Sequence, residues 1–180
     1  MAQRFALAGE IKAELEDASG VGLGDDLDGV AAVGRIDRLA GESVDEVEWG
    51  EGFDIAFDAD MDKVAALDNA GIAAAPSIEA LVRDVDLVIM CLPGEPQLRA
   101  VCLGEDGVVE HLRAGQTVID MTTTTVDIER ELGAAMAAKS VDFADAPIAR
   151  GVSSAQDGTL SIMVGATPEF FARIEPVLAC

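Results

Sequence analysis

The sequence is poor in aromatic residues, histidine and basic side chains. It has no tyrosine, one tryptophan and one histidine, His111, and its 34 acidic side chains outnumber 12 basic ones. The resulting net charge of −22 argues against a nucleic-acid binder, which needs a basic surface to meet phosphates. It argues equally against binding to anionic membrane surfaces. A single histidine also argues against an ordinary zinc site.

Long apolar runs and a cysteine pattern are missing as well. A run such as 87–92 is far shorter than the roughly 20 residues of a membrane-spanning helix. The first residues show no basic region followed by an apolar stretch, so we expect no secretory signal. Cys91, Cys102 and Cys180 are irregularly spaced, which is typical of reduced thiols in a cytoplasmic protein. We interpret Cys91 and Cys102 as small core residues.

The residues that are present predict a folded domain preceded by an unusual segment. Half of the 180 residues are apolar and the mean hydropathy is +0.29, so the acidity does not mark a disordered tail. The length suits one domain with a sizeable core. We predict an atypical acidic segment over residues 1–51, formed by a diverged first strand–helix unit, and an α/β domain over residues 52–180.

Short apolar runs alternate with helical patterns along the second segment. The predicted strands are 54–58, 72–75, 86–92, 117–121, 141–144 and 160–164, and the predicted helices are 61–69, 77–83, 96–102, 107–112, 126–139 and 167–176. Ser77 and Thr167 are placed to cap their helices, and Phe170 and Phe171 are expected to pack in the core. The alternation predicts a doubly wound, mainly parallel sheet, which binds ligands beyond the carboxyl ends of its strands.

Four stretches at those strand ends carry a family pattern. They read GFDIAFDADMDKVAAL (52–67), DLVIMCLP (86–93), GQTVIDMTTTTVD (115–127) and DAPIARGVSSAQDGTLSIMVG (145–165). In order and spacing they resemble the cofactor-binding domain of the β-hydroxyacid dehydrogenases, the group of 3-hydroxyisobutyrate and 6-phosphogluconate dehydrogenase. The resemblance implies a Rossmann-like fold that binds NAD or NADP. It also implies hydride transfer between the nicotinamide and a small anionic 3-hydroxy acid or semialdehyde.

The resemblance assigns cofactor contacts to five positions. Asp58 ends the second strand of the family pattern, where a carboxylate accepts hydrogen bonds from the ribose of NAD and repels the 2′-phosphate of NADP. It therefore favours NAD, with NADP as the alternative. Leu92 and Pro93 would line the nicotinamide ribose, Gln97 would lie near the cofactor, and the Thr123 hydroxyl would bond cofactor or substrate. Without the resemblance, these are a solvated acid, a strand stop and a helix-capping turn.

Residues 145–151 match the substrate loop of the family, which usually reads D-A-P-V-S-G-G. Here Ala149 and Arg150 replace the Ser-Gly pair ahead of Gly151. An arginine binds a carboxylate, sulfonate or phosphate through two parallel hydrogen bonds. We therefore expect Thr123, Ala149, Arg150 and Gly151 to contact a small anionic substrate, as in sulfolactaldehyde-type relatives. A surface arginine in an acidic protein is the alternative.

The chain departs from the family pattern near its N-terminus. No intact G-x-G-x-x-G is present to place a pyrophosphate on a helix N-terminus. The Gly22-Leu23-Gly24 stretch has Leu27 at the third glycine position and is surrounded by acids. Residues 30–34 lie at nearly the right distance before Asp58, but larger side chains follow them where glycines belong. The first strand and its phosphate loop are thus diverged or replaced.

A second departure concerns the catalytic residue. The resemblance places a catalytic lysine beyond the position of Cys180, followed by a helical domain for substrate binding and dimerisation. Lys12, Lys63 and Lys139 fall outside the matching frame. We therefore expect no catalytic residue and no C-terminal helical domain here, and negligible dehydrogenase activity from these 180 residues alone.

The sequence also leaves alternative functions and an oligomeric state to be considered. The main alternative is a non-catalytic dinucleotide-binding or interaction module, a truncated remnant of the enzyme. A homo-oligomer stays open. A phosphatase or receiver-like domain that uses Asp58 or Asp120 is disfavoured, because no metal cluster supports it and the family motifs argue against it.

Overall fold

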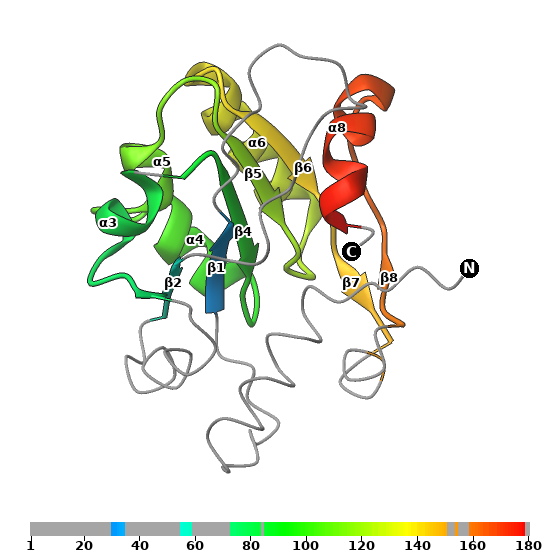
Figure 1. The fold of residues 1–180 in the computed structure, drawn as a ribbon, viewed down its shortest axis with the longest axis horizontal. Coiled ribbons are helices and arrows are strands. Elements are labelled where there is room, and N and C mark those ends of the chain that lie inside the picture. The colour runs from blue at the N-terminus through cyan, green and yellow to red at the C-terminus, as the bar shows by residue number, and fades with distance from the viewer. Residues whose placement is uncertain are drawn as a thin grey trace.

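A computed structural model describes residues 30–34, 55–58, 73–83, 85–150, 154 and 159–178. The predicted helix 61–69, Gly151, Cys180 and most of the segment 1–51 lie outside these residues, and the boundary between residues 51 and 52 stays a prediction. A six-stranded sheet forms the centre of the fold (Figure 1). Its order is β3-β2-β1-β4-β5-β6. The strands are β1 (Val30–Gly34), β2 (Ile55–Phe57), β3 (Ala73–Ala74), β4 (Leu87–Cys91), β5 (Thr117–Asp120) and β6 (Asp142–Asp145).

Five of these strands share one direction and β1 opposes them. β2 pairs with β3 in parallel, and β4, β5 and β6 form a continuous parallel ladder. β1 lies between β2 and β4 and is antiparallel to both, so that Val30 faces Cys91 and Gly34 faces Leu87. The predicted α/β fold with a mainly parallel sheet is confirmed. The reversal of β1 is an addition that the sequence did not predict.

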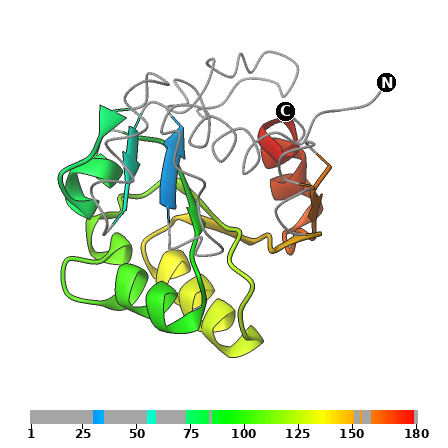
Figure 2. The ribbon, with the colours of Figure 1, turned by 90° about the horizontal axis from the view of Figure 1, so that it is seen from below.

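Helices cover both faces of the sheet (Figure 2). The bounds are α3 (Ile78–Arg83), α4 (Glu95–Leu103), α5 (Val108–His111), α6 (Val126–Ala138) and α8 (Pro168–Leu178). The first four pack on one face against Val88, Met90 and Val118, and α8 packs on the other against residues that include Ile89 and Ile119. Alternate residues of β4 and β5 thus pack into two separate cores, one on each face of the sheet. This explains why both strands are continuous apolar runs in the sequence. None of the described helices is long and apolar enough to cross a membrane.

Local signals set the helix starts as predicted. The Ala80 amide donates to Ser77 Oγ at 3.1 Å, and the Phe170 amide donates to Thr167 Oγ1 at 3.2 Å, so both caps form. The prediction for the aromatic pair is only half right. Phe170 packs against the core under α8, but Phe171 is 38% exposed, because successive residues on a helix point about 100° apart.

The two described cysteines lie in the core. Cys102 is buried and its Sγ donates to Met90 Sδ at 3.3 Å, while Cys91 is half-buried against the core under α8. Burial, and next the charge of Asp120, raises the pKa of Cys91 to about 11. The same causes, with the charge of Glu129 added, raise the pKa of Cys102 further. Both thiols are therefore neutral, as expected of core residues.

A two-stranded antiparallel sheet follows β6. It pairs β7 (Ile148–Ala149) with β8 (Ser161–Ile162). The strand predicted over 160–164 is therefore shorter than expected, and β7 was expected to be loop. In Figure 1 this small sheet lies toward the end of the molecule to which β4, β5 and β6 point.

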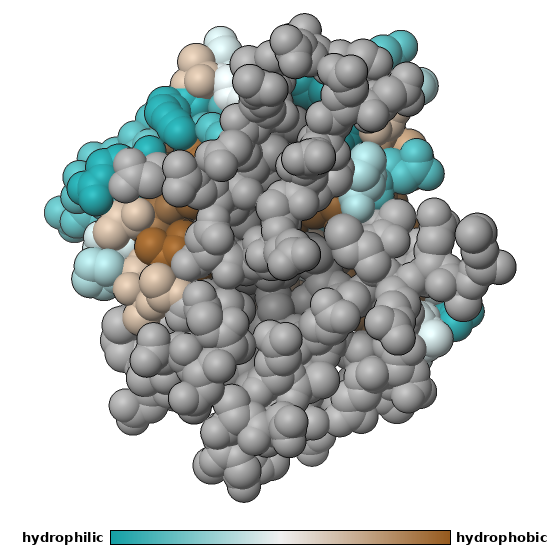
Figure 3. All heavy atoms as spheres, in the orientation of Figure 1, coloured by the Kyte–Doolittle hydropathy of each residue, from teal (hydrophilic) through white to brown (hydrophobic). Residues whose placement is uncertain are grey.

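On the face drawn in Figure 3, hydrophilic side chains cover much of the region of α3 and α5.

Candidate functional site

The carboxyl ends of the parallel strands lie along one edge of the sheet. Met90 pairs with Asp120 and Asp120 pairs with Asp145, so the residues that follow β4, β5 and β6 emerge side by side. Asp58 follows β2 in the same direction. This edge, called the ligand edge below, is where an open α/β sheet binds its ligands.

Hydrogen bonds join the ends of β4 and β5 at the ligand edge. The Leu92 amide donates to Thr122 Oγ1 at 3.0 Å, and the Thr122 amide donates to Asp120 Oδ1 at 2.9 Å. Leu92, Thr122 and Asp120 are all buried, while the adjacent Pro93 and Thr123 are exposed. The buried bonds therefore fix a turn that presents Pro93 and Thr123 to solvent.

The reversal of β1 determines at which edge of the sheet the chain leaves this strand. Because Gly34 pairs with Leu87, the chain leaves β1 at the edge opposite to Leu92. A phosphate-binding turn in this fold follows the first strand and opens a helix. A turn after Gly34 would start roughly 13 Å from the level of Cys91, at about 3.3 Å per strand residue. The described residues therefore supply no phosphate-binding turn after β1 at the ligand edge.

The other predicted cofactor residues also lie at or near the ligand edge. Asp58 is only 3% exposed, so a ribose would reach its carboxylate only after neighbouring atoms move aside. Gln97 is exposed in the first turn of α4, which follows β4. Glu95 is the first residue of α4, and its Oε2 accepts a hydrogen bond from Thr125 Oγ1 at 2.9 Å while its Oε1 accepts one from Arg99 at 3.4 Å.

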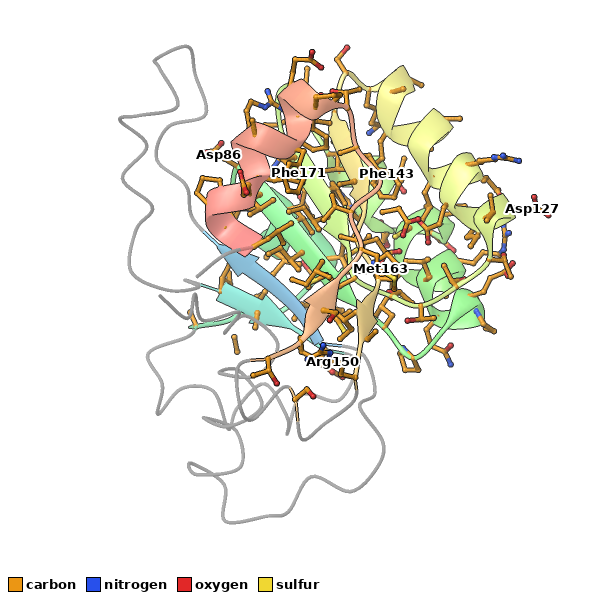
Figure 4. All side chains as sticks on the ribbon, turned by 90° about the vertical axis from the view of Figure 1, so that its right-hand side faces the viewer. Asp86, Asp127, Phe143, Arg150, Met163 and Phe171 are labelled. Atoms are coloured by element: carbon orange, nitrogen blue, oxygen red, sulfur yellow. The ribbon has the colours of Figure 1, made fainter. Side chains whose placement is uncertain are left out.

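Ala149 and Arg150, two of the predicted substrate residues, lie at the end of β7. Ala149 is half-buried in β7, and Arg150 follows it, exposed, with a φ of 91° that L residues rarely adopt. Arg150 Nη1 donates to the Thr159 carbonyl at 3.4 Å. Figure 4 places Arg150 at the end of the molecule where the small sheet turns, away from Asp127 on α6.

A carboxyl cluster that the sequence analysis missed lies beneath the ligand edge. Asp120 is fully buried and Glu129, on α6, is 8% exposed. Burial is the main cause that raises the pKa of Asp120 to about 6 and that of Glu129 to about 8, and the charge of Asp145 adds to both. Burial also raises the pKa of Asp145. Within the described ranges, no group of three or more His, Cys, Asp or Glu residues is arranged to hold a metal ion.

The described basic groups that could transfer a proton lie elsewhere. Lys139 follows α6 and its Nζ donates to the carbonyls of Glu110 and Leu112, at 2.6 and 3.3 Å. His111 lies on α5 with its Nε2 4.0 Å from a carboxyl oxygen of Asp106. His111 comes shortly before β5, and Lys139 comes shortly before β6. Both residues therefore lie near the amino ends of the strands, at the edge opposite to the ligand edge.

A mainly parallel sheet covered on both faces, with polar turns at its carboxyl edge, is typical of α/β domains that bind a ligand at that edge. Residues 49–180 match the family model described as the NAD binding domain of 6-phosphogluconate dehydrogenase. The chain belongs to this family, and the resemblance drawn from its four sequence stretches is confirmed.

Curated relatives and solved structures agree with this assignment. The chain is 34% identical over 122 residues to 3-hydroxyisobutyrate dehydrogenase from Pseudomonas aeruginosa, and 34% identical over 122 residues to 3-sulfolactaldehyde reductase from Escherichia coli. Each match covers 68% of this chain and 41% of the relative. A structure of Psf3 in complex with NADP+ and 2-OPP superposes with a TM-score of 0.64 and 30% identity over 67% of this chain and 43% of that one. The chain therefore spans about two fifths of the length of these proteins.

Proposed function

We propose that this chain is the cofactor-binding part of an oxidoreductase that transfers hydride between NAD or NADP and a small anionic 3-hydroxy acid or its aldehyde. The observation that carries the proposal is the hydrogen-bonded turn that joins β4 and β5 at the ligand edge, within the residues that match the NAD-binding family. The names of the two relatives, which act on 3-hydroxyisobutyrate and 3-sulfolactaldehyde, support the substrate class.

Each residue at the ligand edge has a separate part in this proposal. The bound nicotinamide would supply or accept the hydride. Leu92 and Pro93 would pack against the nicotinamide ribose and exclude water from it. The exposed Thr123 hydroxyl would hydrogen-bond cofactor or substrate, and Asp58 would accept hydrogen bonds from the adenosine ribose. Arg150 would hold the acidic group of the substrate.

The cofactor preference provides the first test. Calorimetric titration is expected to show that the chain binds NAD at least about tenfold more tightly than NADP, a difference of about 1.4 kcal/mol. The physical reason is that the Asp58 carboxylate repels a 2′-phosphate. Asp58→Asn should reduce the preference, because the amide keeps an acceptor and loses the charge. Glu79→Gln removes an equal charge from the exposed side of α3 and should leave the preference unchanged. Absence of heat with either nucleotide would refute cofactor binding.

The substrate loop provides a second test. Titration of the chain with 3-hydroxyisobutyrate or 3-sulfolactate, followed by NMR, should show weaker binding for Arg150→Ala by at least about tenfold, as expected for a lost bidentate contact to an anion. Arg150→Lys should lose part of the affinity, because an ammonium cannot make two parallel bonds. Arg130→Ala removes an exposed arginine of α6 and serves as the control. Equal affinities for Arg150→Ala and the wild-type chain would contradict the assignment.

The reversed β1 favours a second candidate function. Among the described residues, the reversed β1 offers no phosphate turn at the ligand edge, and this would suit a non-catalytic interaction module that keeps the fold of the family. The calorimetric titration separates the two, because only the first candidate requires NAD or NADP to bind.

A further inference from the structure

Three carboxyl groups from three elements meet beneath the ligand edge. Asp120 ends β5, its register partner Asp145 ends β6, and Glu129 projects from the first turns of α6. Asp120 and Glu129 are more than nine-tenths buried and Asp145 is half-buried. Each of the two buried groups changes the proton affinity of the other, and the charge of Asp145 acts on both. The three groups therefore lie close enough for their charges to interact.

The buried oxygens of this cluster lack donors. Asp120 Oδ1 accepts the Thr122 amide, but Asp120 Oδ2 and both carboxyl oxygens of Glu129 are buried without a hydrogen-bond partner in the described part of the chain. Two ionised carboxylates can only accept hydrogen bonds, so facing each other they remain unsatisfied. A buried, unpaired charge is expensive, and two such charges side by side are more so.

Within the described ranges, no cation from the neighbouring elements balances these charges. The other titratable groups that face the cluster are the thiols of Cys91 on β4 and Cys102 on α4, both neutral. Among the described residues, no lysine, arginine or histidine lowers the pKa of Asp120 or Glu129. A proton is the simplest group that satisfies the site, because a carboxylic acid donates one hydrogen bond.

We propose that Glu129 and Asp120 share a proton, and that this hydrogen bond holds the Thr122 turn and Leu92 in the geometry that binds the cofactor. The path is short: Glu129 bonds Asp120 Oδ2, Asp120 Oδ1 accepts the Thr122 amide, and Thr122 Oγ1 accepts the Leu92 amide. Glu129 is then a positioning residue that acts through Asp120. The positioning role rests on the proposed function, whereas the shared proton does not.

The direction of the pH dependence follows from the raised proton affinity. Burial first, and the charge of Asp120 second, raise the pKa of Glu129 from 4.5 to about 8. A group whose pKa rises on folding stabilises the fold fully below its unfolded pKa, and this stability is lost as pH rises through the folded value. The contribution of Glu129 thus falls between about pH 4.5 and pH 8. Loss of the proton should release the Thr122 turn over the upper part of that range.

Two measurements on the 180-residue chain test the proposal. NMR titration of 13C-labelled carboxyl groups should show Glu129 titrating near pH 8, a signal absent from Glu129→Gln. The NAD affinity of the wild-type chain should fall at least about tenfold between about pH 6 and about pH 9 as the proton is lost. Glu129→Gln keeps a donor for Asp120 Oδ2 and should bind NAD equally well at both pH values. Glu129→Ala should bind weakly at both.

An exposed acid on the same helix provides a matched control. Asp127→Asn changes an exposed acid in the first turn of the same helix (Figure 4) and should keep the wild-type pH profile. A Glu129 midpoint near 4.5 would overturn the shared proton. A midpoint near 8 with pH-independent NAD affinity would overturn the positioning role. If no variant binds NAD at any pH, the proposed function and the positioning role fail together, while a midpoint near 8 still establishes the shared proton.

Discussion

The purified 180-residue chain, supplied with NAD and 3-hydroxyisobutyrate, is expected to turn over at least about 100-fold more slowly than a full-length relative, since a missing general base costs about 10²–10⁴ in rate. Oxidation of the alcohol needs a base to take the hydroxyl proton as hydride leaves. Among the described residues, the ligand edge offers carboxylates and threonines, while Lys139 and His111 lie at the opposite edge. The measurement is NADH absorbance.

The comparison should include 3-hydroxyisobutyrate dehydrogenase from Pseudomonas aeruginosa, assayed in the same buffer. Turnover by the chain at a comparable rate would contradict the prediction and would require a proton acceptor from residues outside the described ranges. Turnover below detection, together with calorimetric binding of NAD, would show that binding and chemistry reside on different parts of the protein.

Leu132→Ala is expected to destabilise the domain by about 2–5 kcal/mol, the usual cost of a cavity at a fully buried leucine. Leu132 is completely buried where α6 packs on the sheet, beside Ile128 and Met136. At roughly 2–4 °C per kcal/mol for a domain of this size, the melting temperature should fall by roughly 4–20 °C. Calorimetry or urea unfolding measures the change.

Val126→Ala is the matched control for this substitution. Val126 begins the same helix but is 63% exposed, so its truncation should change the free energy of unfolding by less than about 0.5 kcal/mol. Equal losses for the two variants would mean that α6 does not pack on the sheet through the face that Leu132 occupies.

Most of the fold could be predicted because its signals are local. The apolar runs of β4 and β5, the caps at Ser77 and Thr167, and the alternation of strands and helices each depend on neighbouring residues. The direction of β1 could not be predicted in the same way. A five-residue apolar strand fits a ladder in either direction, and the partners that decide lie far along the chain.

The edge of the sheet at which the candidate residues lie could be predicted, but the buried contacts beneath it could not. Asp58, Leu92 and Thr123 lie at one edge because the ends of parallel strands coincide. Of the threonines 122–125, Thr122 bonds the neighbouring strand, and burial distinguishes it from Thr123 in a way that composition does not. Glu129 did carry a signal: it precedes Leu132 and Met136 by three and seven residues, which places a carboxyl group on the apolar stripe of α6.

The position of β1 also affects the order in which the sheet assembles. β4, β5 and β6 succeed one another through α4, α5 and α6, so they pair within a short stretch of chain. β1 separates this unit from β2 and β3, and it contacts β4 across a long sequence separation. Contacts of high sequence separation form slowly, because closing a long loop costs entropy before any pairing is gained. We therefore expect the pairing of β1 with β4 to form later in folding than the ladder of β4, β5 and β6.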